Sequence, residues 1–234
     1  MTAINEFIDS EKVHQLVLER FEVKPSNQPG MVAGELHQTM DMDPELVELI
    51  QDLYTNSEGF PFEKMYKFSL EEILTYLQAT HRYYLMKKLP EIEQSLVDIF
   101  SKYSESYQLL ASLAYFFNNY KAKLIDHIRF EEKDLFPYIQ LLIKASKGVQ
   151  NTLKLASNPD FSICGFMEAH ACIEDELEQV STLIKRYSGN QALPLPYKIF
   201  LNQVELFEME LRKHAIIEDH VLVPMALELE RNLN

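Results

Sequence analysis

The sequence contains little cysteine, and its two cysteines, Cys164 and Cys172, are eight residues apart. Both fall in one predicted helix, where a rise of about 1.5 Å per residue holds them too far apart for a disulfide. Neither has the spacing of a thiolate metal ligand, which argues against a cysteine-bound zinc or iron–sulphur site. We therefore expect two reduced thiols in the core and a reducing compartment.

Long apolar runs and an export signal are also missing. No apolar run approaches the roughly 20 residues that a membrane span needs. Residues 1–11 include acids and lack the basic and apolar regions of a signal peptide. Together with the reduced thiols, these absences predict a cytoplasmic protein with no membrane partner.

Glycine and basic residues are scarce as well. Six glycines are few for a turn-rich β fold. The 22 basic residues face 36 acidic ones, and the formal net charge of −14 argues against nucleic acid as a partner, because phosphate binding needs a basic surface. Long stretches of leucine, glutamate, lysine and isoleucine without helix breakers predict an all-α protein instead.

The helical pattern divides the chain into two parts. Residues 1–65 are predicted to form a small helical N-terminal unit of unknown role, with helices over 10–23 and 43–54. Residues 66–234 contain four long stretches with apolar residues at intervals of three and four: 69–103, 106–145, 159–187 and 196–229. Four amphipathic helices with short connections favour an antiparallel four-helix bundle. Pro90 is expected to bend or interrupt the first helix.

Each of the four long helices contains one histidine: His81, His127, His170 and His214. In two of them the histidine opens a shared pattern, His-x3-Glu with proline ten residues after the histidine, in HIRFEEKDLFP (127–137) and HAIIEDHVLVP (214–224). A four-residue step places each histidine and its glutamate, Glu131 or Glu218, on one helix face one turn apart. Such pairs could bind one ion or bridge two.

Imidazole and carboxylate together suit iron, manganese or zinc. Carboxylates can bridge two cations and offset their charge, and histidine is easily neutral at pH 7, as a ligand must be. The spacing differs from the His-Glu-x-x-His of zinc proteases and from the Glu-x-x-His of ferritin-like bundles. Two ordinary helical His–Glu contacts are the alternative, but the repetition with the same proline favours a metal site.

Over about residues 69–229 the sequence resembles the hemerythrin-like families, and most of all the bacterial di-iron proteins that repair iron centres. The resemblance rests on the two segments above, on His81 followed by KKLPE (87–91), and on MEAH (167–170). It implies two iron ions (Fe2+/Fe3+) with oxo or hydroxo and carboxylate bridges; zinc or manganese are alternatives. The implied terminal ligands are His81, His127, His170 and His214, and the implied bridging ligands are Glu131 and Glu218.

The sequence departs from this family in three places. Tyr103 lies where a fifth histidine is usual, and Glu174, four residues after His170, creates a third His-x3-Glu and is a further candidate ligand. Repair-type members carry adjacent cysteines in the N-terminal unit, whereas residues 1–65 have none. Asp219 is an alternative to Glu218, because oxygen-carrying hemerythrins use His-x4-Asp.

The resemblance predicts a di-iron protein of the nitrosative or oxidative stress response that assists the repair of iron–sulphur clusters. Its expected partners are iron–sulphur proteins and the diatomic ligands O2 and NO. Two other functions stay open: a module that binds or senses O2 or NO without turnover, and a metal-free helical interaction protein. The sequence decides neither whether the protein is an enzyme nor its oligomeric state.

Overall fold

The computed structural model describes residues 15–17, 19–21, 42–55, 59–102, 107–149, 161–169 and 194–233. Within these ranges the regular structure is helical and includes no strand, so the all-α prediction is confirmed. None of the helices described is long and apolar enough to cross a membrane. The four-helix bundle stays a prediction, because most of the third predicted helix, 159–187, lies outside the described residues.

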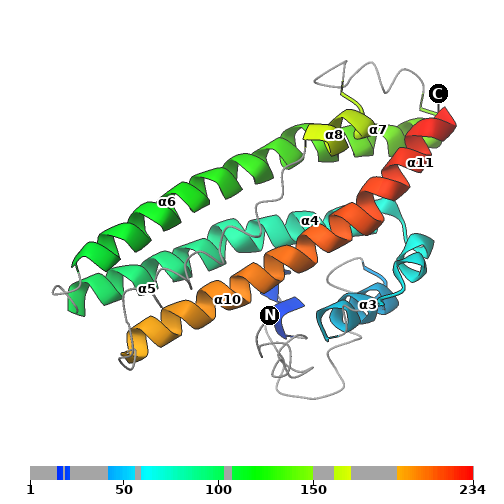
Figure 1. The fold of residues 1–234 in the computed structure, drawn as a ribbon. Helices are drawn as coiled ribbons and strands as arrows, with labels where there is room; N and C mark the ends of the chain where they lie inside the picture. Colours follow the sequence, from blue (N-terminus) through cyan, green and yellow to red (C-terminus); the bar gives the residue numbers. More distant parts are fainter. Residues whose placement is uncertain are drawn as a thin grey trace. The chain divides into compact units, whose positions relative to one another are not determined.

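The described helices are labelled in Figure 1 where space allows. In chain order they are α3 (Pro44–Thr55), η1 (Phe62–Lys67), α4 (Leu70–Tyr83), η2 (Tyr84–Lys88), α5 (Leu89–Lys102), α6 (Tyr107–Phe130), η4 (Glu131–Leu135), α7 (Phe136–Ser146), α8 (Ile163–Ala169), α10 (Leu195–Ile217), η7 (Glu218–Leu222) and α11 (Val223–Leu233). η1 is a 3₁₀ helix, whereas η2, η4 and η7 are π-helical. Three of the four long helices predicted from the sequence are therefore present as uninterrupted helical runs.

Two helix starts follow from side-chain capping. The hydroxyl of Ser69 accepts a hydrogen bond from the backbone N–H of Glu72 at 3.2 Å, and the Glu72 carboxylate accepts one from the N–H of Ser69 at 3.0 Å. This is a reciprocal capping box at the start of α4. At α3 the Asp43 carboxylate accepts a hydrogen bond from the N–H of Glu45 at 2.8 Å, as is typical of an aspartate at a helix start.

The π-helical segments each end two residues before a proline: Pro90, Pro137 and Pro224. Proline has no N–H, and its ring crowds the carbonyl one turn earlier, so an ordinary α-turn is unfavourable there. A π-turn uses hydrogen bonds across five residues, as from the N–H of Phe136 to the Glu131 carbonyl and from that of Val223 to Glu218. Pro90 was expected to bend or interrupt the helix; the α-helical geometry is interrupted by η2 just before it, and the chain stays helical into α5.

The chain divides into two compact units. One comprises residues 1–83, 139–155 and 216–234, and the other comprises residues 84–138 and 156–215. The predicted domain boundary after residue 65 stays a prediction.

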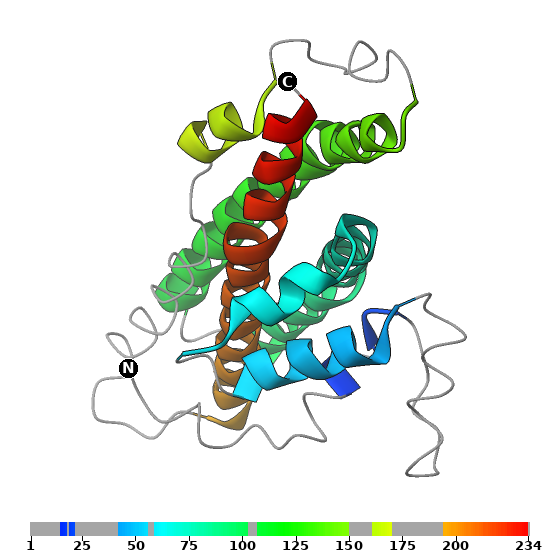
Figure 2. The ribbon, with the colours of Figure 1, turned by 90° about the vertical axis from the view of Figure 1, so that its right-hand side faces the viewer.

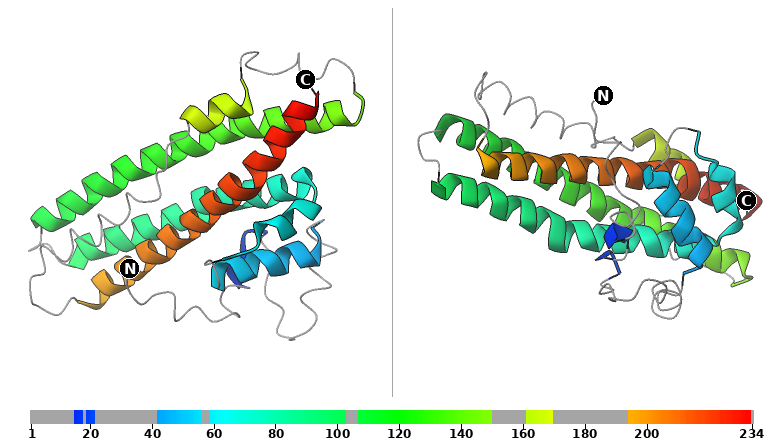
Figure 3. Two further views of the ribbon diagram at one scale, coloured as in Figure 1. Left: turned by 45° about the vertical axis from the view of Figure 1, so that its right-hand side comes forward. Right: turned by 90° about the horizontal axis from the view of Figure 1, so that it is seen from below.

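In the unit that contains residues 84–138, α5 and α6 lie side by side and antiparallel (Figure 1). An ion pair of 2.6 Å joins Lys121 and Glu93 across this hairpin. The short helix α8 lies against α6, as Figure 3 shows, and the rings of Phe166 and Phe130 stack with centroids 5.8 Å apart. These contacts fix the end of α6, which carries His127.

The other unit packs its early residues on α4, and α3 with the segment leading into α4 can be followed in Figure 2. Arg20 is 2% exposed and donates a hydrogen bond to the hydroxyl of Tyr54 on α3. Its guanidinium also lies 5.8 Å from the ring centroid of Tyr76 and 5.4 Å from that of Tyr83, both on α4. Cation–π contacts of this kind stabilise a buried guanidinium, so Arg20 ties residues before α3 to the helix that carries His81.

Candidate metal centre

The carboxylate of Glu131 is the central group of the candidate site. Glu131 is the first residue of η4 and is 0% exposed. Its Oε1 atom lies 2.8 Å from Nε2 of His127, which is half-buried one turn earlier at the end of α6. At this distance a protonated Nε2 donates a hydrogen bond to the carboxylate. The four-residue spacing predicted from the sequence thus brings imidazole and carboxylate together.

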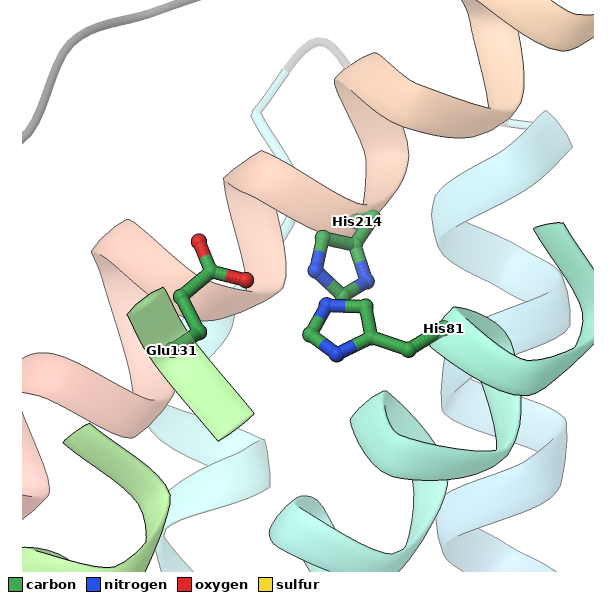
Figure 4. Close-up of side chains that lie close together, drawn as sticks. All are labelled: His81, Glu131 and His214. Carbon is green, nitrogen blue, oxygen red and sulfur yellow. The ribbon is translucent and has the colours of Figure 1, made fainter. Parts of the chain in front are cut away.

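A second imidazole of the same unit approaches this carboxylate from α10. A ring nitrogen of His214 and a carboxylate oxygen of Glu131 lie within 4.8 Å of each other. Figure 4 shows the Glu131 carboxylate pointing toward the His214 ring. Two ligand atoms bound to one ion at about 2.0–2.2 Å are at most about 4.4 Å apart. Small side-chain rotations are therefore enough for these two residues to share an ion.

Aromatic side chains enclose His214, which is itself 6% exposed. The ring of Tyr84 meets the imidazole edge-on with centroids 5.9 Å apart, and it meets Phe207 in the same way at 5.2 Å. Tyr84 and Phe207 are both 0% exposed. The two rings restrict the orientation of the imidazole and keep bulk water from that side of it, which strengthens electrostatic interactions at the site.

A second buried carboxylate, Glu210, lies on α10 one turn before His214 and was not among the residues predicted from the sequence. Glu210 is 0% exposed, and its Oε1 atom lies 3.5 Å from Nζ of Lys88 on η2. Lys213 is also buried, at 6% exposed, and burial lowers the pKa of its ammonium group. The spacing Glu-x3-His, the reverse of the repeated pattern, is the sequence signal that would have indicated Glu210.

The two remaining described candidates, His81 and Glu218, belong to the unit that contains residues 1–83. His81, the third side chain labelled in Figure 4, is 2% exposed in the last turn of α4. Glu218 is 1% exposed and is the first residue of η7. Within this unit α4 and η7 pack against each other. A buried carboxylate is costly unless cations or donors face it, so the burial of Glu218 fits a ligand role.

Burial also separates Glu218 from its alternative. Asp219 and His220, the next two residues of η7, are exposed, whereas Glu218 is buried. The carboxylate that belongs to the repeated His-x3-Glu is therefore the one placed in the interior.

Four residues named in the sequence analysis lie outside the described part of the chain: His170, Glu174, Tyr103 and Cys172. Their roles stay predictions. Cys164 on α8 is described, and its thiol is free, as expected, but exposed. The expectation that it lies in the core was wrong, because α8 turns Ile163 and Phe166 inward and leaves Cys164 on its outer face.

No family model, curated protein or solved structure matches this chain. The likeness to hemerythrin-like proteins therefore stays an expectation, and the site has to be judged by its own residues. Those residues form buried histidine and glutamate groups that could hold a metal ion. Neutral imidazoles and carboxylates are the donor types that iron, manganese and zinc accept.

Proposed function

We propose that this protein binds a pair of iron ions and acts in the response to nitrosative or oxidative stress by assisting the repair of iron–sulphur clusters. The observation that carries the proposal is the buried Glu131 carboxylate, which has His127 at 2.8 Å and a nitrogen of His214 within 4.8 Å. A carboxylate between two imidazoles in the interior is a group that a cation stabilises.

In the proposed centre the carboxylates of Glu131 and Glu218 would hold the two ions. The proposed terminal ligands are His81, His127, His170 and His214, with Glu174 as a further ligand. Two anionic carboxylates offset part of the charge of two cations, which neutral histidines cannot do. Support comes from the burial of Glu131, Glu218, His81 and His214, all of which are at most 6% exposed.

When bound, such an ion pair supplies a Lewis-acidic, redox-active centre for small ligands such as O2 and NO. The chain itself keeps bulk water from one side of His214 and restricts the orientation of that imidazole. Tyr84 and Phe207 cover His214, and the Lys88–Glu210 ion pair places compensated charges one helical turn away. Iron–sulphur proteins of the cytoplasm are the partners that a repair function requires.

The test is metal content with an optical spectrum, measured on protein purified from iron-supplemented cells. We expect about two irons per chain and near-ultraviolet bands that shift when NO is added. Glu131→Gln should lose the iron, whereas Glu93→Gln, which alters the part-exposed ion pair with Lys121, should keep it. A protein with no metal, or with a single zinc, would refute the proposal and favour a metal-free interaction protein.

Repair and sensing are separated by a second assay. Iron-loaded protein should restore the activity of a nitric-oxide-damaged iron–sulphur enzyme, with loaded Glu93→Gln as the matched control. A stoichiometric, reversible spectral change with NO or O2 and no recovery of the damaged enzyme would assign the protein to sensing instead.

A further inference from the structure

The 3₁₀ helix η1 packs on the π-helical segment η7 within one unit of the chain. The hydroxyl of Tyr66 donates a hydrogen bond to the backbone carbonyl of His220 at 3.0 Å. The ring of Phe62 stacks on the His220 imidazole, with centroids 4.8 Å apart and 21° between the planes. η1 thus contacts one residue of η7 through both its backbone and its side chain.

The carbonyl that Tyr66 contacts is the one affected by Pro224. In an α-helix the carbonyl of His220 would accept from the N–H four residues later, and that residue is Pro224, which has no N–H. Backbone carbonyls in folded proteins are nearly always satisfied by some donor. The Tyr66 hydroxyl supplies a donor from outside the helix at the position where proline removes the internal one.

The backbone conformation of η7 affects the position of the Glu218 carboxylate, because Glu218 is the first residue of η7. A π-turn contains more residues than an α-turn, so a change between the two rotates the side chains of the segment about the helix axis. Glu218 is 1% exposed two residues before His220. A contact that fixes His220 therefore also fixes the direction in which the Glu218 carboxylate leaves the helix.

We propose that η1 is a clamp on η7, and that Tyr66 and Phe62 are positioning residues for the carboxylate of Glu218. The clamp rests on the proposed function only in its consequence, which is metal binding by Glu218. It gives a role to η1, the 3₁₀ helix between α3 and α4. Tyr66 is 45% exposed, so removal of its hydroxyl leaves the core intact.

The clamp is tested first on metal-free protein by amide hydrogen exchange. Tyr66→Phe and Phe62→Leu should speed exchange at the Val223 N–H, which donates to the Glu218 carbonyl within η7. We expect about a two- to tenfold increase, the fold-change that corresponds to one hydrogen bond of typical strength. Tyr115→Phe is the matched control, because Tyr115 is 73% exposed on α6. Unchanged exchange in both η1 variants would overturn the clamp.

The second readout is the affinity for ferrous iron. Both η1 variants should bind iron about two- to tenfold more weakly than the wild type and the Tyr115→Phe control, with unfolding midpoints close to the wild type. Faster exchange at Val223 with unchanged iron affinity would refute the positioning of Glu218. If the wild type binds no iron, the proposed function fails, and the exchange data still decide the clamp.

Discussion

Substitution of Glu131 by glutamine tests whether this carboxylate is a metal ligand or only the partner of His127 in an ion pair. Glutamine keeps the shape of the side chain but removes the charge that a metal ion needs. In metal-free protein Glu131 is 0% exposed and its Oε1 atom lies 2.8 Å from Nε2 of His127. His127 is only half-buried, so the substitution leaves no fully buried charge without its partner. We expect a small change in stability in the metal-free protein and the loss of the stabilisation that metal provides in the loaded protein.

The magnitudes follow from two separate terms. Without metal, loss of a hydrogen bond to a charged group is largely offset by relief from burying the carboxylate, so the free energy of unfolding should change by less than about 1.5 kcal/mol. With metal at one hundred times its dissociation constant, the free energy of unfolding of the wild type rises by about 2.7 kcal/mol. For a chain of this size that gain raises the unfolding midpoint by about 5–11 °C.

The assay is thermal unfolding of wild type, Glu131→Gln and the control Glu93→Gln, each with and without ferrous iron under anaerobic conditions. The wild type and the control should show the metal-dependent rise in midpoint, and Glu131→Gln should show almost none. An equal rise in all three proteins would show that Glu131 is not a ligand. In that case its contact with His127 only stabilises the fold, and the proposed centre has to be abandoned.

Three further predictions concern the surroundings of the site and the surface. Tyr84→Ala should destabilise the protein by about 3–5 kcal/mol in urea unfolding, because it opens a cavity beside His214, whereas Tyr84→Phe keeps the ring and should cost less than about 1.5 kcal/mol. Burial lowers the pKa of Lys213 below its ordinary 10.5, so the unfolded chain binds more protons than the folded chain, and the free energy of unfolding should rise as pH increases toward 10.5. Lys213→Met should flatten that rise when unfolding is measured between pH 8 and 10.5. The hydrogen bond from the Lys147 ammonium holds the pKa of Glu71 below 4.5, so this pair stabilises the fold above pH 4.5 and loses its effect as pH falls further. Lys147→Met should remove that small contribution. Unfolding in high salt should mask the difference between variant and wild type, because both side chains are largely exposed.

Local features of this protein were predictable because they depend on neighbours in sequence. The capping box of Ser69 and Glu72 needs only two side chains three residues apart, and it forms at the start of α4. The His127–Glu131 contact likewise follows from the helical repeat. The all-helical class follows from apolar spacing summed over long stretches, which is more reliable than any single position.

Features that depend on tertiary packing were not predictable in the same way. Glu210 is an acid among 36 Asp and Glu residues, and its spacing of four residues before His214 does not by itself show that it is 0% exposed beside Lys88. Cys164 was assigned to the core from its residue type, but the angle at which α8 packs leaves it exposed. The clamp joins residues 154 positions apart in the chain, from Tyr66 to His220, and no local pattern predicts such a pair.

All three long helical runs have a π-helical segment before a proline, but only two of these segments begin with a glutamate. Each π-helical segment begins six residues before its proline, and the residues at those three positions are Tyr84, Glu131 and Glu218, each at most 1% exposed. The first run therefore has the same π-helical segment before a proline, but a tyrosine stands where the other two runs have a glutamate. His81 lies three residues before its π-segment, whereas His127 lies four before its own. The proline shared by the two copies of the repeat thus also follows the π-helical segment of the first run, and only two of the three segments supply a carboxylate from their first position.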